Sequence, residues 1–112
     1  MPCVNIKAKK TDKAVDLKSL ARELSEKTGI TKERINIIVD FYDSADFFSG
    51  GKDDQIIVML YISETNDNSA VKHIMQAIAA VTGKHFGEES VSTAVVCNVI
   101  KEGFMYLNKQ FK

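Results

Sequence analysis

The sequence predicts an α/β domain of the α+β type, in which two tandem β-α-β units form a four-stranded mixed sheet with two helices on one face. Three observations lead to this prediction: an internal repeat, a strand–helix–strand order within each copy, and a length of 112 residues, which is near the commonest size for one domain. We therefore expect a single domain over 1–112, with pseudo-repeats at 1–48 and 55–112.

The internal repeat holds across a strand and a helix with a constant offset of 54 residues. Val4 matches Val58, Leu20 matches Ile74, and the Thr-Gly pair at 28–29 matches the pair at 82–83. Strand–helix–strand connections are almost always right-handed crossovers between parallel strands. Each copy is therefore expected to pair its own two strands in parallel.

The first unit opens with VNIKA at 4–8, whose alternation of apolar and polar residues is typical of a half-buried strand. A helix is expected over roughly 13–27, because leucines at 17, 20 and 24 form one apolar stripe. Thr11 or Asp12 is the expected N-cap, and Gly29 is expected to end the helix in the left-handed conformation. RINIIVDFY at 34–42 then predicts the second strand.

The second unit repeats this order. QIIVMLYIS at 55–63 is a strand pattern that is almost continuously apolar, as expected when both faces are covered. A helix within 64–83, closed by Gly83, and a β-branched strand at 90–100 follow, and DSADFFSGGKDD at 43–54 is the loop between the units. The sheet face opposite the helices carries Ile38, Val96 and Ile100, so we expect another subunit to cover it.

The composition excludes several classes of partner. Lys plus Arg (15) equals Asp plus Glu (15), and this zero net charge argues against nucleic acid or an anionic membrane. No apolar run approaches the roughly 20 residues that span a bilayer, and no signal peptide is evident, so we expect a cytoplasmic protein. Cys3 and Cys97 have neither metal-ligand nor disulfide-framework spacing, and His73 and His85 are expected to be inert.

Pro2 is the strongest candidate for a catalytic residue in this sequence. If Met1 is removed, Pro2 becomes a free secondary amine at the start of a strand. An α-amino group ordinarily has a pKa of about 7.7–8.0, and desolvation or neighbouring cations disfavour its charged form. Such a base suits removal of a proton from the carbon beside a carbonyl. Proline is common enough, at about 5% of residues, that a purely accidental position stays open at this point.

Four segments carry a resemblance to a known family: MPCVNI at 1–6, LSEKTGITKERINIIV at 24–39, FFSGG at 47–51 and, loosely, YLNKQF at 106–111. Together with the tandem β-α-β units, they resemble the tautomerase superfamily, which includes 4-oxalocrotonate tautomerase (4-OT), 5-carboxymethyl-2-hydroxymuconate isomerase and macrophage migration inhibitory factor. The resemblance covers nearly the whole chain.

The resemblance implies a homotrimer whose sheets form an inner barrel, with active sites near subunit boundaries. Pro2 would be the general base for keto–enol or 1,3-allylic proton transfer on a small 2-keto or 2-hydroxy acid, that is, a small carboxylated enol or ketone. No metal and no organic cofactor would take part.

The substrate-binding residues of the family carry over less completely than its base. KKTD at 9–12 replaces an arginine, Arg34 lies two residues before the position that aligns with a second one, and Ser92 and Ala94 replace a tyrosine and an asparagine. The substrate-binding residues that the resemblance suggests are Lys9, Lys32, Arg34, Phe48, Ile62 and Tyr106.

Two alternatives to the tautomerase hypothesis remain open from the sequence. One is a non-catalytic oligomeric binding or scaffold protein on the same fold. The other is a ferredoxin-like regulatory domain that binds a small ligand between subunits, in which Pro2 is irrelevant.

Overall fold

The computed structural model describes residues 2–12, 14–50, 55–86 and 92–112. Met1, and the parts of the predicted inter-unit loop and last strand at 51–54 and 90–91, lie outside the described residues. The elements run in the order β1 (Cys3–Lys9), α1 (Leu17–Thr28), the 3-10 turn η1 (Lys32–Arg34), β2 (Asn36–Tyr42), the 3-10 turn η2 (Ser44–Asp46), β3 (Ile56–Ser63), α2 (Asn68–Phe86), β4 (Thr93–Ile100), β5 (Tyr106–Leu107) and β6 (Gln110–Phe111).

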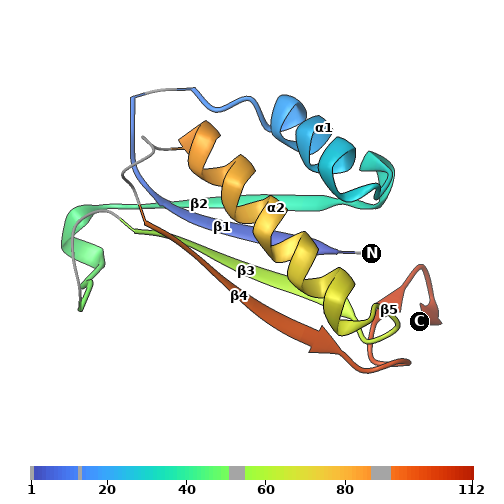
Figure 1. The fold of residues 1–112 in the computed structure, drawn as a ribbon. Coiled ribbons are helices and arrows are strands. Elements are labelled where there is room, and N and C mark those ends of the chain that lie inside the picture. The colour runs from blue at the N-terminus through green and yellow to red at the C-terminus, as the bar shows by residue number, and fades with distance from the viewer. Residues whose placement is uncertain (1, 13, 51–54, 87–91) are drawn as a thin grey trace.

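The four long strands form one sheet in the order β2-β1-β3-β4, and both helices lie on one face of it (Figure 1). β1 pairs with β2 in parallel, β3 pairs with β4 in parallel, and the two units join through the antiparallel pair β1 and β3. The predicted mixed sheet of two β-α-β units is therefore confirmed. Each unit joins adjacent strands, which is not the split β-α-β arrangement of the ferredoxin-like alternative.

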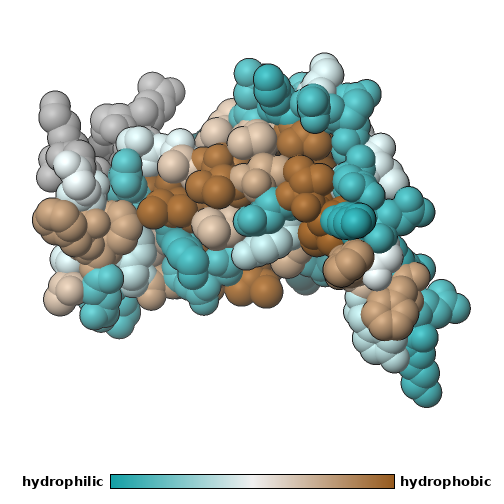
Figure 2. Space-filling model, turned by 90° about the horizontal axis from the view of Figure 1, so that it is seen from below, coloured by the Kyte–Doolittle hydropathy of each residue, from teal (hydrophilic) through white to brown (hydrophobic). Residues whose placement is uncertain are grey.

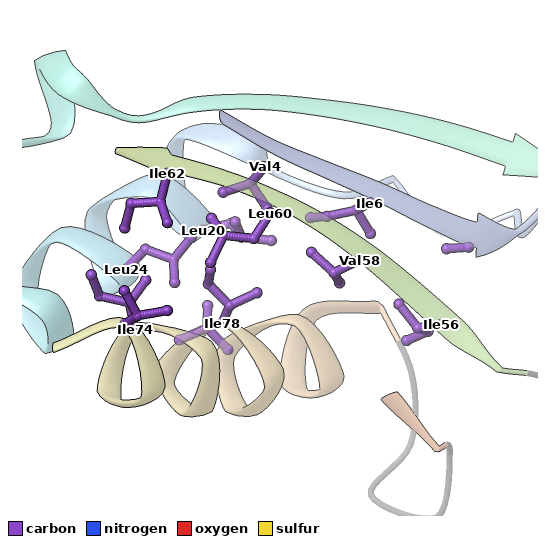
Figure 3. Packing of buried hydrophobic residues seen from close by; sticks show 13 residues of the cluster. Val4, Ile6, Leu20, Leu24, Ile56, Val58, Leu60, Ile62, Ile74 and Ile78 are labelled. Carbon is purple, nitrogen blue, oxygen red and sulfur yellow. The ribbon is translucent and has the colours of Figure 1, made fainter. Parts of the chain in front are cut away.

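The core fills the space between the sheet and the two helices. Alternate residues of β1 and β3 point toward the helices, and Leu20 and Leu24 of α1 meet Ile74 and Ile78 of α2 beneath them (Figure 3). Leu20 and Leu60 are fully buried. The leucine stripe expected of the first helix is thus what packs that helix on the sheet.

Helix α1 starts later than the sequence analysis predicts. Asp16, and not Thr11 or Asp12, is the N-cap: its Oδ1 accepts hydrogen bonds from the backbone N–H of Lys18 at 3.0 Å and of Ser19 at 3.2 Å. An apolar stripe fixes which face of a helix is buried but not the first residue of the helix. The predicted C-terminal end is confirmed, because Gly29 adopts φ 77° there.

Replacing Asp16 with alanine is expected to lower the free energy of unfolding by about 1 kcal/mol, because two N–H groups at the start of α1 lose their acceptor. Chemical denaturation measures the change. Asp12→Ala is the matched control, since this exposed aspartate precedes the helix, and it should leave stability nearly unchanged. Equal losses in the two variants would contradict the assignment of the cap.

Helix α2 continues past Gly83 to Phe86, so the prediction that Gly83 ends it was wrong. The reason is tertiary. The Phe86 ring lies 6.3 Å from the ring of Phe41, and Lys84 Nζ is 2.9 Å from Glu23 Oε1 on α1. The hydrogen bond from Lys84, assisted by His85, holds the pKa of Glu23 below its ordinary value. These contacts stabilise the three helical residues that follow Gly83 in α2.

The sheet face away from the helices is uncovered in a single chain. The strand register places Ile38, Asn5, Met59 and Val96 in one row across this face. Ile38 is 55% exposed and Val96 48% exposed, and apolar side chains gather across the middle of the face (Figure 2). Ile38, Val96 and Ile100 thus lie on the open side as predicted, and the near-continuous apolar sequence of β3 has only one face covered within the chain.

Polar residues occupy one part of the same face. Asp40 accepts hydrogen bonds from Asn5 Nδ2 at 3.0 Å and Lys7 Nζ at 3.2 Å, and these contacts hold its pKa below the ordinary value. In the described part of the chain, no helix has the length and apolar character needed to cross a membrane.

Candidate functional site

Pro2 lies buried at the beginning of β1. Its ring packs on the helix side of the sheet, in a small apolar niche lined also by Val4, Leu24, Thr28, Ile30, Ile35, Ile74 and Ile78. Its carbonyl oxygen accepts a hydrogen bond of 3.1 Å from the backbone N–H of Asn36 at the start of β2. Ring packing and backbone pairing together fix the orientation of this residue.

Strand geometry predicts that the nitrogen of Pro2 points to the β2 side, toward the backbone carbonyl of Arg34. In an extended strand the nitrogen and the carbonyl of one residue point to the same edge, and the Pro2 carbonyl points to β2. The second unit gives a direct comparison: Ile56, which matches Pro2, donates its N–H to the carbonyl of Ser92, the residue just before its β4 partner. The corresponding residue on the β2 side is Arg34.

A pocket of about 310 Å³ opens at this same end of the sheet. Continuing the β1–β3 register beyond the pair Cys3 and Tyr61 puts Ile62 opposite Pro2 and Ser63 one place past its nitrogen. Arg34 and Ser63 both line the pocket, so it lies at the same end of the sheet as Pro2, although Pro2 itself lines the apolar niche and is not among the described residues of this pocket. We call it the cationic pocket, and its described lining residues are Arg34, Ser63, Thr65, Ile100, Lys101, Met105, Leu107 and Lys112.

The electrostatics of the cationic pocket favour an anion. Arg34, Lys101 and Lys112 are three positive groups, and no carboxylate side chain is among the described residues that line it. Two hydroxyl groups and an apolar wall complete the lining. A planar guanidinium binds a carboxylate through two parallel hydrogen bonds, so the pocket can hold a small molecule with an acidic head and an apolar body.

Glu64 fixes the backbone on both sides of Lys101 through two hydrogen bonds. Its N–H donates to the carbonyl of Ile100 at 2.9 Å, and its Oε1 accepts from the N–H of Glu102 at 2.9 Å. Lys101 lies between these two anchor points, with its ammonium group 5.8 Å from the centre of the Phe104 ring.

The β5–β6 hairpin forms the outer wall. Its strands are joined through Asn108 and Lys109, both with positive φ, and the N–H of Lys112 donates to the carbonyl of Met105 at 2.7 Å. This pairing returns Lys112 to the base of the hairpin beside the pocket.

No family model and no curated protein matches the sequence. Solved structures do match its fold. A wild-type fused 4-OT in a symmetric trimer superposes with a TM-score of 0.81 at 15% identity, and the match covers 97% of this chain and 94% of that one. The chain has the tautomerase fold.

Other structures with the tautomerase fold agree. Pt0534, solved after inactivation by 2-oxo-3-pentynoate, matches at a TM-score of 0.81 and 11% identity over 97% of this chain and 94% of its own. Macrophage migration inhibitory factor from Toxoplasma gondii matches at 0.64 and 11% over 98% and 99%. At these identities the matches establish the fold, and the resemblance noted in the sequence is confirmed at that level.

Of the predicted binding residues, only Arg34 is among the described residues that line the cationic pocket. Arg34 lines the cationic pocket, although it lies in η1 and not on the second strand as predicted, because the N–H of Arg34 closes a turn onto the carbonyl of Thr31. Lys32 is in the same turn but not among the described pocket residues. Tyr106 is 62% exposed on the hairpin, with its ring 5.1 Å from that of Phe111.

The remaining predicted residues lie elsewhere. Ile62 is opposite Pro2 but is buried in the core, with 1% of its surface exposed. Lys9 is at the far end of β1, paired with Tyr42, and Phe48 is 92% exposed in the segment that follows η2. Within one chain, Lys9 and Phe48 are therefore at the end of the sheet opposite the cationic pocket (Figure 1).

Sequence reasoning missed Lys101, Lys112, Ser63 and Thr65. These residues sit just after strand ends or in the hairpin, and only the sheet order shows that the ends of β3 and β4 meet the beginning of β1. Cys3 and Cys97 project from opposite faces of the sheet, and burial raises the pKa of the Cys97 thiol. Among the described residues, no three His, Cys, Asp or Glu side chains gather as a metal site requires.

Proposed function

We propose that this protein is a divergent member of the tautomerase superfamily and a cofactor-independent tautomerase or isomerase. Pro2, freed by removal of Met1, is the general base, and the substrate is a small 2-keto or 2-hydroxy acid. The observation that carries the proposal is the placement of Pro2 and the cationic pocket at the same end of the sheet, where Arg34, Lys101 and Lys112 line the pocket.

In the proposed reaction, Arg34 binds the substrate carboxylate and holds the carbon next to the carbonyl against Pro2. The neutral Pro2 nitrogen takes a proton from that carbon, the electron pair moves into the carbonyl, and an enolate forms. The positive charges of Lys101 and Lys112 lower the energy of this anion. The protonated proline then returns its proton to oxygen or to the distant allylic carbon, so the base is regenerated.

We further propose a homotrimer in a cytoplasmic setting. The uncovered apolar row on the sheet supports an oligomer, because such a surface is rarely left open to water. Fused 4-OT forms symmetric trimers on this fold. In a cyclic trimer, the far end of one sheet can approach the site of the next subunit, so Lys9 and Phe48 remain candidate contributors to a neighbour's site, with Ile62 and Tyr106 supporting their own. Lys32 lies in η1 beside Arg34 and is given no role in binding.

The proposal is tested by turnover and by covalent labelling. Ketonisation of phenylenolpyruvate and of a 2-hydroxydienoate is followed by ultraviolet absorbance. The free amine of Pro2 is expected to add to the conjugated alkyne of 2-oxo-3-pentynoate, with the amine proton transferred to carbon. Fragment-ion mass spectrometry should then place one reagent molecule on Pro2 and not on the neighbouring free thiol of Cys3. A folded oligomer with neither turnover nor label would instead support the non-catalytic scaffold.

Arg34 and Lys32 give a matched pair of binding variants, since both lie in η1 and both are cationic. Arg34→Gln is expected to raise KM by roughly 10- to 100-fold, because charged hydrogen bonds contribute about 1.5–3 kcal/mol. Lys32→Gln should leave KM close to that of the parent. The assignment of Arg34 to the carboxylate fails if the two variants have the same KM.

A further inference from the structure

The two hydroxyl groups of the cationic pocket form a pair. Ser63 Oγ and Thr65 Oγ1 lie 3.0 Å apart, and either can donate to the other. Ser63 Oγ also accepts the backbone N–H of Thr65 at 3.2 Å. The turn that carries them is fixed by further hydrogen bonds, in which Asn66 donates twice to the carbonyl of Ser63.

The Ser63–Thr65 pair has one O–H donor that its internal hydrogen bond does not use. Each hydroxyl has one hydrogen to donate and two lone pairs that accept. One hydrogen is used within the pair, whichever residue donates it. The other O–H is left for a ligand, and it comes from Thr65 or from Ser63 according to the direction of the internal bond. Both residues line the cationic pocket, and we infer that the remaining O–H is directed into it.

The position of the pair relative to Pro2 would let this donor reach the carbonyl oxygen of a bound 2-keto acid. Continued beyond the pair Cys3 and Tyr61, the β1–β3 register places Ser63 one residue past Pro2, and Arg34 lies on the β2 side of the same end of the sheet. A 2-keto acid whose carboxylate lies on Arg34 and whose reacting carbon faces Pro2 therefore has its carbonyl oxygen free to turn toward β3. A hydroxyl donor there strengthens its bond as negative charge develops on that oxygen.

We propose that the Ser63–Thr65 hydroxyl pair donates the hydrogen bond that stabilises the enolate oxygen in this site. The proposal rests on the proposed function and adds to it a directed donor that the lysines, as mobile point charges, do not supply. The rigid turn holds the donor in place before the reaction, which is the condition under which such a bond accelerates proton abstraction.

The test compares the double variant Ser63→Ala/Thr65→Val with Thr65→Ser, which keeps both hydroxyls. The double variant is expected to lose about 10²-fold in kcat, while Thr65→Ser stays near the parent. Each single deletion leaves one hydroxyl able to donate, so Ser63→Ala and Thr65→Val alone should lose less than the double variant. Ser69→Ala, an exposed serine on α2, is a control for the loss of a hydroxyl away from the pocket.

Binding of 3-phenylpropionate separates a catalytic donor from a structural one. This acid has a carboxylate but no oxygen at C2, so its affinity should be the same in the parent and in the double variant. The proposal is overturned if the double variant keeps the parent's kcat, or if kcat and 3-phenylpropionate affinity fall together. Failure of the proposed function is distinct, because the parent itself would then show neither turnover nor labelling of Pro2.

Discussion

Placing one alanine between Met1 and Pro2 is expected to abolish turnover while the protein stays folded. Processing then leaves an Ala-Pro amide, whose nitrogen has no lone pair able to accept a proton. The proline ring and its contacts in the apolar niche are retained, so the change affects the chemistry of one atom. Loss of a general base typically costs about 10²–10⁴-fold in rate. Ketonisation assays measure the loss, and circular dichroism checks the fold.

Pro2→Ala is the complementary variant, since it keeps a free amine but removes the ring. It should retain part of the activity and lose some stability, because the ring is buried. In the parent, kcat/KM should rise with pH through the pKa of the amine, since only the neutral form accepts a proton. An alanine-extended protein that turns over as fast as the parent would end the general-base assignment for Pro2.

Val96→Asp is expected to dissociate the oligomer into folded monomers. Val96 lies on the uncovered sheet face in the row with Ile38 and Met59. If another subunit covers this row, each introduced carboxylate is buried without a partner, at a cost of several kcal/mol. Analytical ultracentrifugation at several protein concentrations measures the shift in mass.

Val99→Asp is the matched control, because Val99 is on the same strand, is also about half exposed at 56%, and points to the helix side. It should leave the oligomer intact. Dissociation by both variants would point to general destabilisation of β4. An unchanged mass for Val96→Asp would show that the open face is not the interface, and the proposed trimer would need another surface.

The fold could be predicted because its signals are local. The repeat offset, the alternation in β1 and the leucine stripe of α1 each follow from short segments, and the parallel pairing within each unit follows from the helical crossover that joins its two strands. Gly29 ended its helix as expected because its role depends only on its own backbone conformation.

One error arose where distant residues decide the local structure. Gly83 has the same sequence context as Gly29, yet α2 continues through it because Phe86 and Lys84 find partners on β2 and α1. The error at the start of α1 was local: the Asp16 carboxylate accepts the N–H groups of Lys18 and Ser19, and the apolar stripe contains no information on which residue caps the helix.

Some residues of the candidate site could be found from the sequence, and others only from the order of the strands. Pro2 was recognisable from its position in the chain and Arg34 from the family resemblance, whereas Lys101, Lys112 and the hydroxyl pair required the strand order. The sequence places them dozens of residues apart, and no spacing between them reports that the end of β3 lies beside the beginning of β1. Phe48 and Lys9 were chosen by resemblance, and in one chain they lie at the other end of the sheet.

The duplication of the β-α-β unit also determines how many catalytic amines each chain can carry. Ile56 takes the place of Pro2 in the second unit, but its nitrogen is an internal peptide amide that already donates to Ser92. Two copies of the supersecondary unit thus share a single terminal amine. A trimer of this chain would carry three N-terminal proline amines for six β-α-β units, so 2-oxo-3-pentynoate directed to Pro2 should label at most one of the two pseudo-symmetric positions in each polypeptide.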